Sequence, residues 1–363
     1  MTRSTIEPKC DPKIIVYTRA FNAEKTIRRA VESILNQTYS DFEYYLIDNG
    51  STDQTRAIME EYAKSDARVS AMSIEAMNNI GTFKEILPKK YPDNYYLCYL
   101  DADDEYMLDF LEKTFAFAQA NDLDIAVAGS DYIDADSGHV VERKTINKEL
   151  IIQGRAFADE FMQYRGLIGA FWGKLFKYTT FKGISLDKLP TIRFCNDSIH
   201  LWTYFKRVKR FGFLPQSLYK YYLYPNSLSR YFNCDRLNDC HVFFRQYKKS
   251  LERFGPISPL NMDYLYAIWL GWMDDFIFKP LCDIDLPIEK KLSLLSDVFA
   301  SAVTKAMLRH VADPRFHNLA AREDFLQRVC AWVYAQEESK TTQGRVLVAK
   351  MLKNMDTRPK GSL

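Results

Sequence analysis

Residues 95–104 read YYLCYLDADD, an apolar run that leads directly into a cluster of carboxylates. A short apolar run bounded by polar residues is typical of a buried β-strand. The same form occurs twice earlier, where Ile14–Tyr17 is followed by TRAFN at 18–22 and Phe42–Ile47 by DNGS at 48–51. The segments between these runs carry apolar residues at helical spacing. Strands that alternate with helices predict an α/β fold with a doubly wound, mainly parallel sheet and helices on both faces.

The other expected elements continue this alternation. We expect strands at 14–17, 42–47, 69–74, 95–100 and 124–128, and helices at 27–35, around 58–62, from about 82 to before Pro88, and at 107–119. Asn22 is the expected N-cap of the first helix, and Ser51-Thr52-Asp53-Gln54 has the form of a capping box for the second. After a turn at 134–138, Val140-Val141 is expected to return as a β-hairpin.

The pattern changes in the second half of the chain. Residues 154–232 are less regular, and from about Asn233 only helical patterns remain, broken by prolines. A chain of 363 residues is long enough for two domains. We therefore expect an α/β domain over residues 1–232 and an all-α C-terminal region over residues 233–363.

The composition excludes several classes of protein. The chain is 47% hydrophobic and 26% charged with a net charge of +2, so that no global positive field favours nucleic acid as a partner. Its seven cysteines are scattered and odd in number, which favours a reduced, cytoplasmic setting over a disulfide framework or a zinc site. The N-terminus lacks the apolar segment of a signal peptide.

The longest uncharged apolar run in the second half is Tyr264–Met273, about half of the ~20 residues that a membrane-spanning helix needs. We expect no transmembrane span. We interpret this run as part of the core between packed helices. The alternative is an exposed apolar face that contacts the inner side of the membrane peripherally or forms a homo-oligomer.

Asp101-x-Asp103 is the motif with the clearest chemical meaning. Open α/β sheets bind ligands at the carboxyl ends of their strands, and two carboxylates there repel each other unless a cation lies between them. A divalent ion held by such a pair together with substrate phosphates is a common use. The alternative is that Asp103-Asp104-Glu105 only begins the next helix. No GxGxxG dinucleotide loop and no P-loop is present.

Further motifs stand in a fixed order around this pair. They are Asn22, QTYSDFE at 37–43, IDNGSTD at 47–53, NIG at 79–81, LDADD at 100–104, WGKL at 172–175, Asn196-Asp197, LPQSLY at 214–219 and PNSLS at 225–229. The ordered set resembles the inverting glycosyltransferases of family 2, which have the GT-A fold, over roughly residues 12–232.

The resemblance implies a nucleotide-sugar donor site at the strand ends. Thr18 and Phe21 fall where the family lines the base and ribose. Asn49 stands where much of the family has an aspartate that accepts the uracil N3–H. Asp101 would lie by the ribose and the metal, and Asp103 would bind Mg²⁺ or Mn²⁺ on the diphosphate.

The resemblance also implies a catalytic base and a phosphate contact. Asp197 would be the general base, preceded by Asn196 where the family usually has glutamate; the pair could also simply cap a helix. Ile86 falls near the position of a family arginine that faces the diphosphate, so that this role would pass to Lys84 or Arg19.

Several residues near the expected acceptor side have two interpretations. Trp172 could stack on a sugar or belong to the core. Lys174 could meet phosphate or be a solvated strand residue. The tyrosines at 219, 221, 222 and 224 could hold an acceptor glycan, or could belong to a strand buried on both faces.

These observations predict a metal-dependent transferase that moves a sugar from a nucleotide diphosphate, with UDP or dTDP favoured, to a hydroxyl of a saccharide or glycan acceptor. A role in polysaccharide biosynthesis follows from such an acceptor. The alternatives are a GT-A-like domain that has lost turnover and binds a partner, and a phosphatase or nucleotidyltransferase that uses the two aspartates directly.

Overall fold

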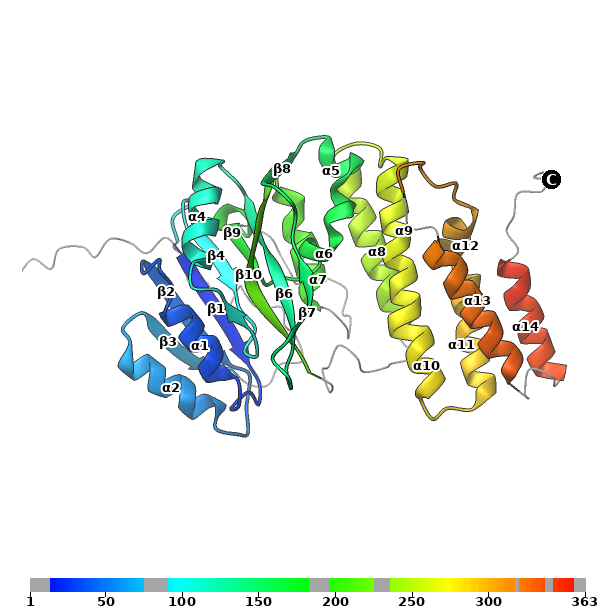
Figure 1. Ribbon diagram of the computed structural model, residues 1–363, viewed down its shortest axis with the longest axis horizontal. Coiled ribbons are helices and arrows are strands. Elements are labelled where there is room, and N and C mark those ends of the chain that lie inside the picture. The colour runs from blue at the N-terminus through cyan, green and yellow to red at the C-terminus, as the bar shows by residue number, and fades with distance from the viewer. Residues whose placement is uncertain are drawn as a thin grey trace, which may run out of the picture. The chain divides into compact units, whose positions relative to one another are not determined.

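The computed structural model describes residues 14–74, 91–182, 196–224, 236–316, 320–336 and 342–355 (Figure 1). These residues form two compact units. Of the described residues, the first contains 14–74, 91–154, 164–182 and 196–224, and the second contains 155–163, 236–316, 320–336 and 342–355. Residues 155–163 lie within the predicted first domain but pack with the second unit. The predicted boundary near residue 232 is outside the described residues and stays a prediction.

Within the described residues, ten strands of the first unit form one mixed sheet. The strands are β1 (Ile14–Ala20), β2 (Phe42–Asp48), β3 (Val69–Ser73), β4 (Tyr96–Tyr99), β5 (Glu105–Tyr106), β6 (Ile125–Asp134), β7 (Val140–Lys144), β8 (Leu150–Gln153), β9 (Lys174–Lys177) and β10 (Arg210–Leu223). Their order is β3-β2-β1-β4-β9-β6-β10-β5, with β7 paired to β6 and β8 to β10.

The first four strands in this order are parallel, and Ile14 of β1 lies opposite both Phe42 and Tyr96. All side chains from Ile14 to Thr18 are buried, because both faces of a central parallel strand are covered; its sequence is therefore continuously apolar and does not alternate. β9 then enters antiparallel between β4 and β6, and β6 and β10 are parallel again. The predicted α/β fold with a mainly parallel sheet is confirmed, with antiparallel strands inserted.

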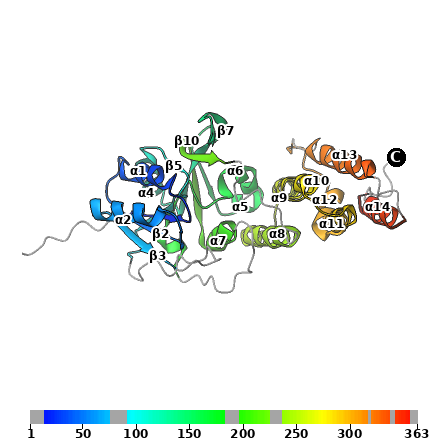
Figure 2. The ribbon, with the colours of Figure 1, turned by 90° about the horizontal axis from the view of Figure 1, so that it is seen from below.

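Helices cover both faces of this sheet (Figures 1 and 2). They are α1 (Ile27–Leu35), α2 (Thr55–Ser65), α4 (Phe110–Ala120), α6 (Arg165–Ile168) and α7 (Asn196–Tyr204). Val16 belongs to one apolar cluster with residues of α1, α2 and α4. Tyr17, the next residue along β1, points to the other face and lies near Tyr204 of α7. The helix expected between 82 and 88 lies outside the described residues.

The loops after β1 and β2 cap each other. The side-chain oxygen of Asn22 accepts a hydrogen bond from the Thr52 amide (2.9 Å), and the Ser51 hydroxyl accepts one from the Asn22 amide (3.0 Å). The residues that precede α1 and α2, Thr26 and Gln54, make no capping hydrogen bond of their own. The predicted N-cap at Asn22 and the capping box at Ser51 are therefore wrong, because these side chains reach across to the neighbouring loop.

Glu24 and Asp53 continue this exchange. The Glu24 amide donates to Asp53 Oδ2 (3.2 Å), and the Gln54 amide donates to Glu24 Oε2 (3.1 Å). Each carboxylate thus satisfies a free amide at the start of the other helix. The two strand ends are held side by side as a result.

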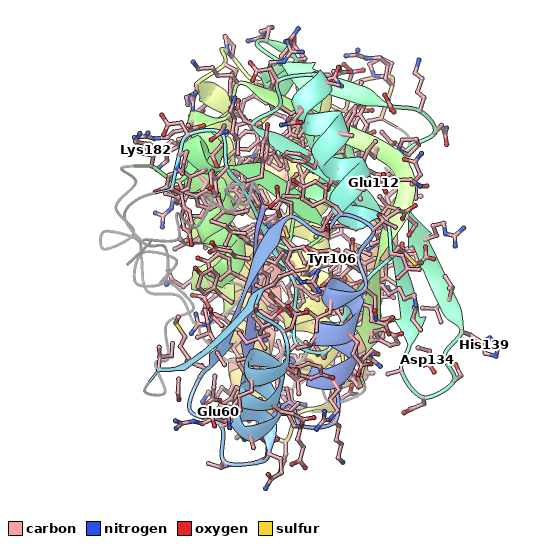
Figure 3. The ribbon with its side chains drawn as sticks, turned by 90° about the vertical axis from the view of Figure 1, so that its left-hand side faces the viewer. Glu60, Tyr106, Glu112, Asp134, His139 and Lys182 are labelled. Atoms are coloured by element: carbon pink, nitrogen blue, oxygen red, sulfur yellow. The ribbon has the colours of Figure 1, made fainter. Side chains whose placement is uncertain are left out.

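The predicted hairpin after residue 134 is confirmed. β6 continues from the predicted strand at 124–128 to Asp134, and β7 returns antiparallel to it. The Asp134 amide donates to the His139 carbonyl (2.9 Å), and both residues lie at the tip of the hairpin in Figure 3.

The described elements of the second unit are all helical, as predicted. Its α-helices are α5 (Ala156–Asp159), α8 (Arg236–Glu252), α9 (Pro259–Met273), α10 (Lys279–Asp283), α11 (Ile288–Ala300), α12 (Ala302–Arg309), α13 (Ala320–Ala335) and α14 (Thr342–Met355). A π-helix at Asp274–Phe278 joins α9 to α10. The apolar run Tyr264–Met273 lies in α9, where Trp269 is fully buried and its Nε1 donates to Thr304 Oγ1 (3.0 Å). In the described part of the chain, no helix combines the length and the apolar character needed to cross a bilayer.

Candidate active site

A hollow of about 520 Å³ lies at the carboxyl ends of β1 and β4. This is where open α/β sheets bind their ligands. Residues from the ends of four strands contribute to its lining, among them Arg19, Phe21, Asp53, Asp101, Asp103 and Tyr224. The reciprocal capping described above holds the first two of these loops in place.

Asp101 and Asp103 both line the hollow, as predicted for a metal pair. Asp103 is exposed at the surface of the hollow, where nearby protein atoms replace part of the water around its carboxyl. This raises the pKa of Asp103, against the opposing effect of a backbone hydrogen bond and of the nearby Arg29. Binding of a cation would lower that pKa and keep the carboxylate ionised.

Asp104 has a different role from its two neighbours. It is buried, and its carboxyl accepts hydrogen bonds from the Tyr219 hydroxyl (2.7 Å) and the Tyr222 amide (2.8 Å). Burial, reinforced by the charges of Asp101 and Asp103, raises the pKa of Asp104 well above its ordinary value. Asp104 therefore anchors the loop to β10.

The donor set of the hollow fits a cation that binds together with a ligand. Among the residues that the structure describes, no group of three or more His, Cys, Asp or Glu side chains could hold a metal ion. Two carboxylates leave most of the coordination shell of Mg²⁺ or Mn²⁺ to water and ligand oxygens, which suits a phosphate-bound cation and not a closed structural site.

Arg19 and Asn49 join the ends of β1 and β2. Arg19 Nη2 donates to Asn49 Oδ1 (3.1 Å), and the Asn49 amide donates to the Ala20 carbonyl (2.8 Å). Arg19 Nη1 is buried and has no hydrogen-bond partner in the described part of the chain. Asn49 is half-buried and is not among the described residues that line the hollow; it contacts Arg19, which does line it.

Phe21 and Thr18 differ sharply in exposure. Phe21 is 56% exposed at the hollow, which is unusual for a large apolar side chain and suits contact with a ring. Thr18 is fully buried, and its hydroxyl lies 2.8 Å from that of Tyr44. The Thr18 side chain therefore does not reach the hollow, contrary to the expectation that it lines the base.

Trp172 and Lys174 lie beside β10. Trp172 is half-buried and stacks on Tyr219 (ring centroids 4.5 Å apart) and Tyr221 (5.1 Å). Lys174 is 1% exposed in β9, and its Nζ donates to the Trp172 carbonyl (3.2 Å). Lys174 is thus not a solvated strand residue, and the Trp172 stack belongs to the packing around β10.

Three predicted residues cannot be placed as side chains. Lys84 and the NIG motif at 79–81 lie outside the described residues. Asn196 and Asp197 begin α7, but their side chains are not among those described. The catalytic role of Asp197 stays a prediction.

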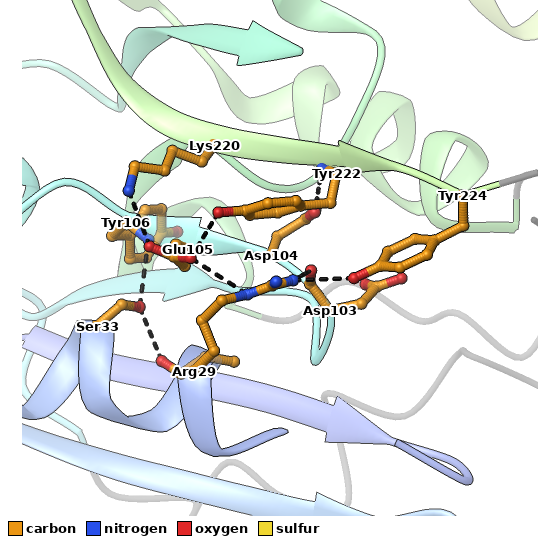
Figure 4. A network of polar contacts seen from close by, with 10 residues as sticks. Arg29, Ser33, Asp103, Asp104, Glu105, Tyr106, Lys220, Tyr222 and Tyr224 are labelled. Carbon is orange, nitrogen blue, oxygen red and sulfur yellow. Dashed lines mark hydrogen bonds and ion pairs between the residues drawn. The ribbon is translucent and has the colours of Figure 1, made fainter. Parts of the chain in front are cut away.

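The sequence did not predict a network around Arg29 of α1, shown in Figure 4. Arg29 pairs with Glu105 (Nε–Oε1 3.2 Å), and its guanidinium lies over the Tyr222 ring, 3.6 Å from the centroid. Its Nη2 donates to the Asp103 carbonyl and to the Tyr224 hydroxyl (3.0 Å). One arginine therefore connects the carboxylate loop to the end of β10.

Glu105 completes this network by accepting from Lys220 Nζ (3.0 Å) and the Tyr222 hydroxyl (2.7 Å). Tyr222 and Tyr224 stand two residues apart, which places them on one side of an extended chain. This spacing of the two tyrosines is the only feature of the local sequence that indicates the network. The contact with Arg29 could not be predicted, because Arg29 is 195 positions away from Tyr224.

Comparison with known proteins places residues 15–189 in a family. Residues 15–189 match the model described as Glycosyl transferase family 2. Glycosyltransferase GlyA of Streptococcus pneumoniae serotype 4 is 27% identical over 229 residues, which cover 61% of this chain and 32% of that protein. Glycosyltransferase EpsJ of Bacillus subtilis (strain 168) is 27% identical over 233 residues, covering 60% and 63%. The chain thus spans about a third of the length of GlyA and less than two thirds of that of EpsJ.

The fold has a counterpart among solved structures. The crystal structure of S. aureus TarS 1-349 in complex with UDP-GlcNAc superposes with a TM-score of 0.60 at 15% sequence identity, over 94% of this chain and 89% of that one. At this identity the likeness concerns the fold alone. The resemblance inferred from the ordered motifs is confirmed: residues 15–189 belong to glycosyltransferase family 2, and the described part of the first unit has the GT-A fold.

Proposed function

We propose that the protein is an inverting glycosyltransferase that moves a glycosyl unit from a nucleoside diphosphate sugar to a hydroxyl of a saccharide or glycan, with Mg²⁺ or Mn²⁺ as cofactor. The observation that carries the proposal is that Asp101 and Asp103 share one hollow with Arg19 and Phe21. The family match and the glycosyltransferase relatives support the reaction class.

The charges around the hollow support a cation-dependent donor. Four carboxylates line it, from Glu24, Asp53, Asp101 and Asp103, against the two basic side chains of Arg19 and Lys25. A diphosphate alone would meet net negative charge there. A divalent cation between the diphosphate and the Asp101–Asp103 pair removes this repulsion. When bound, it would neutralise the charge that develops on the leaving diphosphate.

Arg19 is the proposed protein contact to phosphate. Its buried Nη1 lacks a partner among the described residues, and an unpaired buried donor costs about 1–3 kcal/mol. A phosphate oxygen would satisfy it after a small movement of the side chain. Lys84 remains the second proposed contact.

We propose UDP or dTDP as the nucleotide because of Asn49. An amide oxygen has two lone pairs, and Arg19 uses one of those on Oδ1. The other can accept the N3–H of uracil or thymine, while the amide N–H donates to a neighbouring carbonyl of the base. The exposed ring of Phe21 supplies an apolar contact for the base or ribose.

Asp197 is the proposed general base. It would take the proton of the acceptor hydroxyl as this attacks the anomeric carbon from the face opposite the diphosphate, which inverts the configuration. Asn196 and Trp172 are proposed to support the acceptor, and Lys174 to hold the backbone at Trp172.

The helical unit is proposed to place the acceptor or to mediate self-association, at the inner face of the membrane or in the cytoplasm. No nucleic acid is expected as a partner. Sedimentation of the full chain with and without anionic vesicles separates self-association from membrane contact.

Release of nucleoside diphosphate tests the proposed reaction. UDP-GlcNAc, the ligand of TarS, and other UDP-, dTDP- and GDP-sugars are incubated with the full chain in Mn²⁺, in Mg²⁺ or in EDTA. We expect release that needs the cation and prefers a pyrimidine nucleotide. Absence of both binding and release with every donor would favour the partner-binding alternative.

A further inference from the structure

We propose that Tyr224 is a donor-binding residue whose hydroxyl, held by Arg29, donates a hydrogen bond to a diphosphate oxygen in the hollow. This inference rests on the proposed function, because it requires a nucleoside diphosphate ligand.

The position of Tyr224 is the first observation. It follows directly after β10, is half-buried, and lines the hollow together with Asp101 and Asp103. Tyr222, two residues earlier, uses its hydroxyl on Glu105 and does not line the hollow. The two tyrosines therefore share a network but differ in access to a ligand.

The second observation is that Arg29 is fixed. The Tyr222 ring lies under its guanidinium, Glu105 pairs with its Nε, and the Asp103 carbonyl accepts from its Nη2. A guanidinium held on three sides cannot follow Tyr224 if that side chain moves. It therefore sets the place of the Tyr224 oxygen.

The direction of the hydrogen bond gives the third step. Arginine only donates, so that the Tyr224 oxygen accepts from Nη2 and its own proton is left to donate elsewhere. In the described part of the chain, no acceptor for that proton is found. A hydroxyl polarised by a cation donates most strongly to an anionic oxygen.

The fourth step identifies the diphosphate as the acceptor. The same Arg29 nitrogen contacts both the Tyr224 hydroxyl and the Asp103 carbonyl, each within 3.0 Å. The hydroxyl therefore lies next to the loop that is proposed to hold the cation. A diphosphate on that cation carries the anionic oxygens nearest to Tyr224, whereas the base is expected at Asn49, beyond Arg19.

Tyr224→Phe tests the inference, and Tyr222→Phe is the matched control. Each variant keeps its ring and loses one hydroxyl of the network. Calorimetry in Mn²⁺ measures the Kd of UDP and of uridine, or of GDP and guanosine if the wild type prefers GDP. We expect Tyr224→Phe to weaken diphosphate binding about ten-fold, as for loss of a hydrogen bond to a charged group, with nucleoside affinity unchanged. Tyr222→Phe should stay within about two-fold of the wild type.

Arg29→Lys provides a second variant, since it keeps the charge but loses the planar guanidinium that lies over the Tyr222 ring and holds the Tyr224 hydroxyl. Adding Tyr224→Phe to Arg29→Lys should weaken UDP binding less than it does in the wild type. Equal UDP affinity in Tyr224→Phe and wild type would overturn this inference and leave the proposed function intact. A parallel loss for uridine would overturn the assignment to the diphosphate. A wild type that binds no nucleoside diphosphate would overturn both proposals.

Discussion

Arg19 at the end of β1 donates a hydrogen bond to the side-chain oxygen of Asn49 at the end of β2, at 3.1 Å. Because arginine only donates, this contact orients the Asn49 amide with its oxygen toward Arg19. An aspartate at this position would neutralise Arg19 as an ion pair. Asparagine leaves the charge of Arg19 available to a phosphate.

Asn49→Ala is expected to reduce the preference for UDP over GDP about ten-fold, because the N3–H of uracil would lose its acceptor. Competition of UDP, dTDP and GDP for the Mn²⁺-loaded protein measures the effect. Asn49→Asp should shift the preference toward GDP, because a carboxylate can accept both N1–H and N2–H of guanine and has no N–H to donate to a uracil carbonyl. An Asn49→Ala variant with unchanged preference would show that Asn49 does not contact the base.

Asp103→Asn is expected to abolish the gain in UDP affinity that Mn²⁺ provides, because an amide cannot balance the charge of the cation. Calorimetry with Mn²⁺ and with EDTA measures this gain. Glu24→Gln removes a charge from the same hollow, keeps an oxygen for the Gln54 amide, and should retain the Mn²⁺ effect. Loss of the effect in both variants would point to the total charge of the hollow instead of a metal ligand.

Asp197→Asn is expected to lower glycosyl transfer by about 10²–10⁴-fold, the range for removal of a general base. The Kd of the donor should not change, because the base acts on the acceptor proton. Single-turnover transfer and donor binding are measured on the same preparation. Transfer at a near-normal rate would exclude Asp197 as the base.

Asp104 should make stability depend on pH. Its pKa is raised in the folded protein, so that the folded state holds the proton more tightly than the unfolded chain, whose value is about 3.9. The folded state then loses stability as pH rises above about 4, until the raised pKa is passed. The asparagine of Asp104→Asn cannot ionise, so this variant should not lose this stability. In EDTA, we therefore expect the difference in Tm, variant minus wild type, to increase from about pH 4 to pH 8. A difference that falls with pH would contradict the raised pKa.

Asn261→Ala is expected to destabilise the helical unit by several kcal/mol, since about 1–3 kcal/mol is lost for each buried group left unpaired. Asn261 is fully buried in α9; it accepts from the Met162 amide (2.7 Å) and donates to the Phe157 and Ala158 carbonyls (3.0 Å each). Denaturant unfolding measures the loss, with the exposed Asn238→Ala as control. Equal stability of the two variants would show that residues 155–163 are not anchored by α9.

Most of the described strands and helices up to residue 134 could be predicted because their apolar spacing is local; β5, two residues long, was missed. Ile14–Tyr17 is continuously apolar since β1 is covered on both faces, and α1 buries Ile27, Ala30, Val31 and Ile34 at helical spacing. The Asp101–Asp103 pair could be placed at a strand end for the same reason. β9 was not predicted, because four residues inserted antiparallel carry too short a pattern to be distinguished from a loop.

The sequence by itself determined the α/β class, the family and the two carboxylates of the hollow, since each depends on residues close together in the chain. Tertiary structure alone decided which neighbouring side chains face the hollow. In the folded protein, Thr18 and Asp104 are buried and Arg29 contacts Tyr224. The side chain of Asn22, before α1, accepts a hydrogen bond from the loop before α2 instead of capping α1. These contacts join segments 26 to 195 positions apart, and they depend on strand order and side-chain direction, which no local spacing encodes.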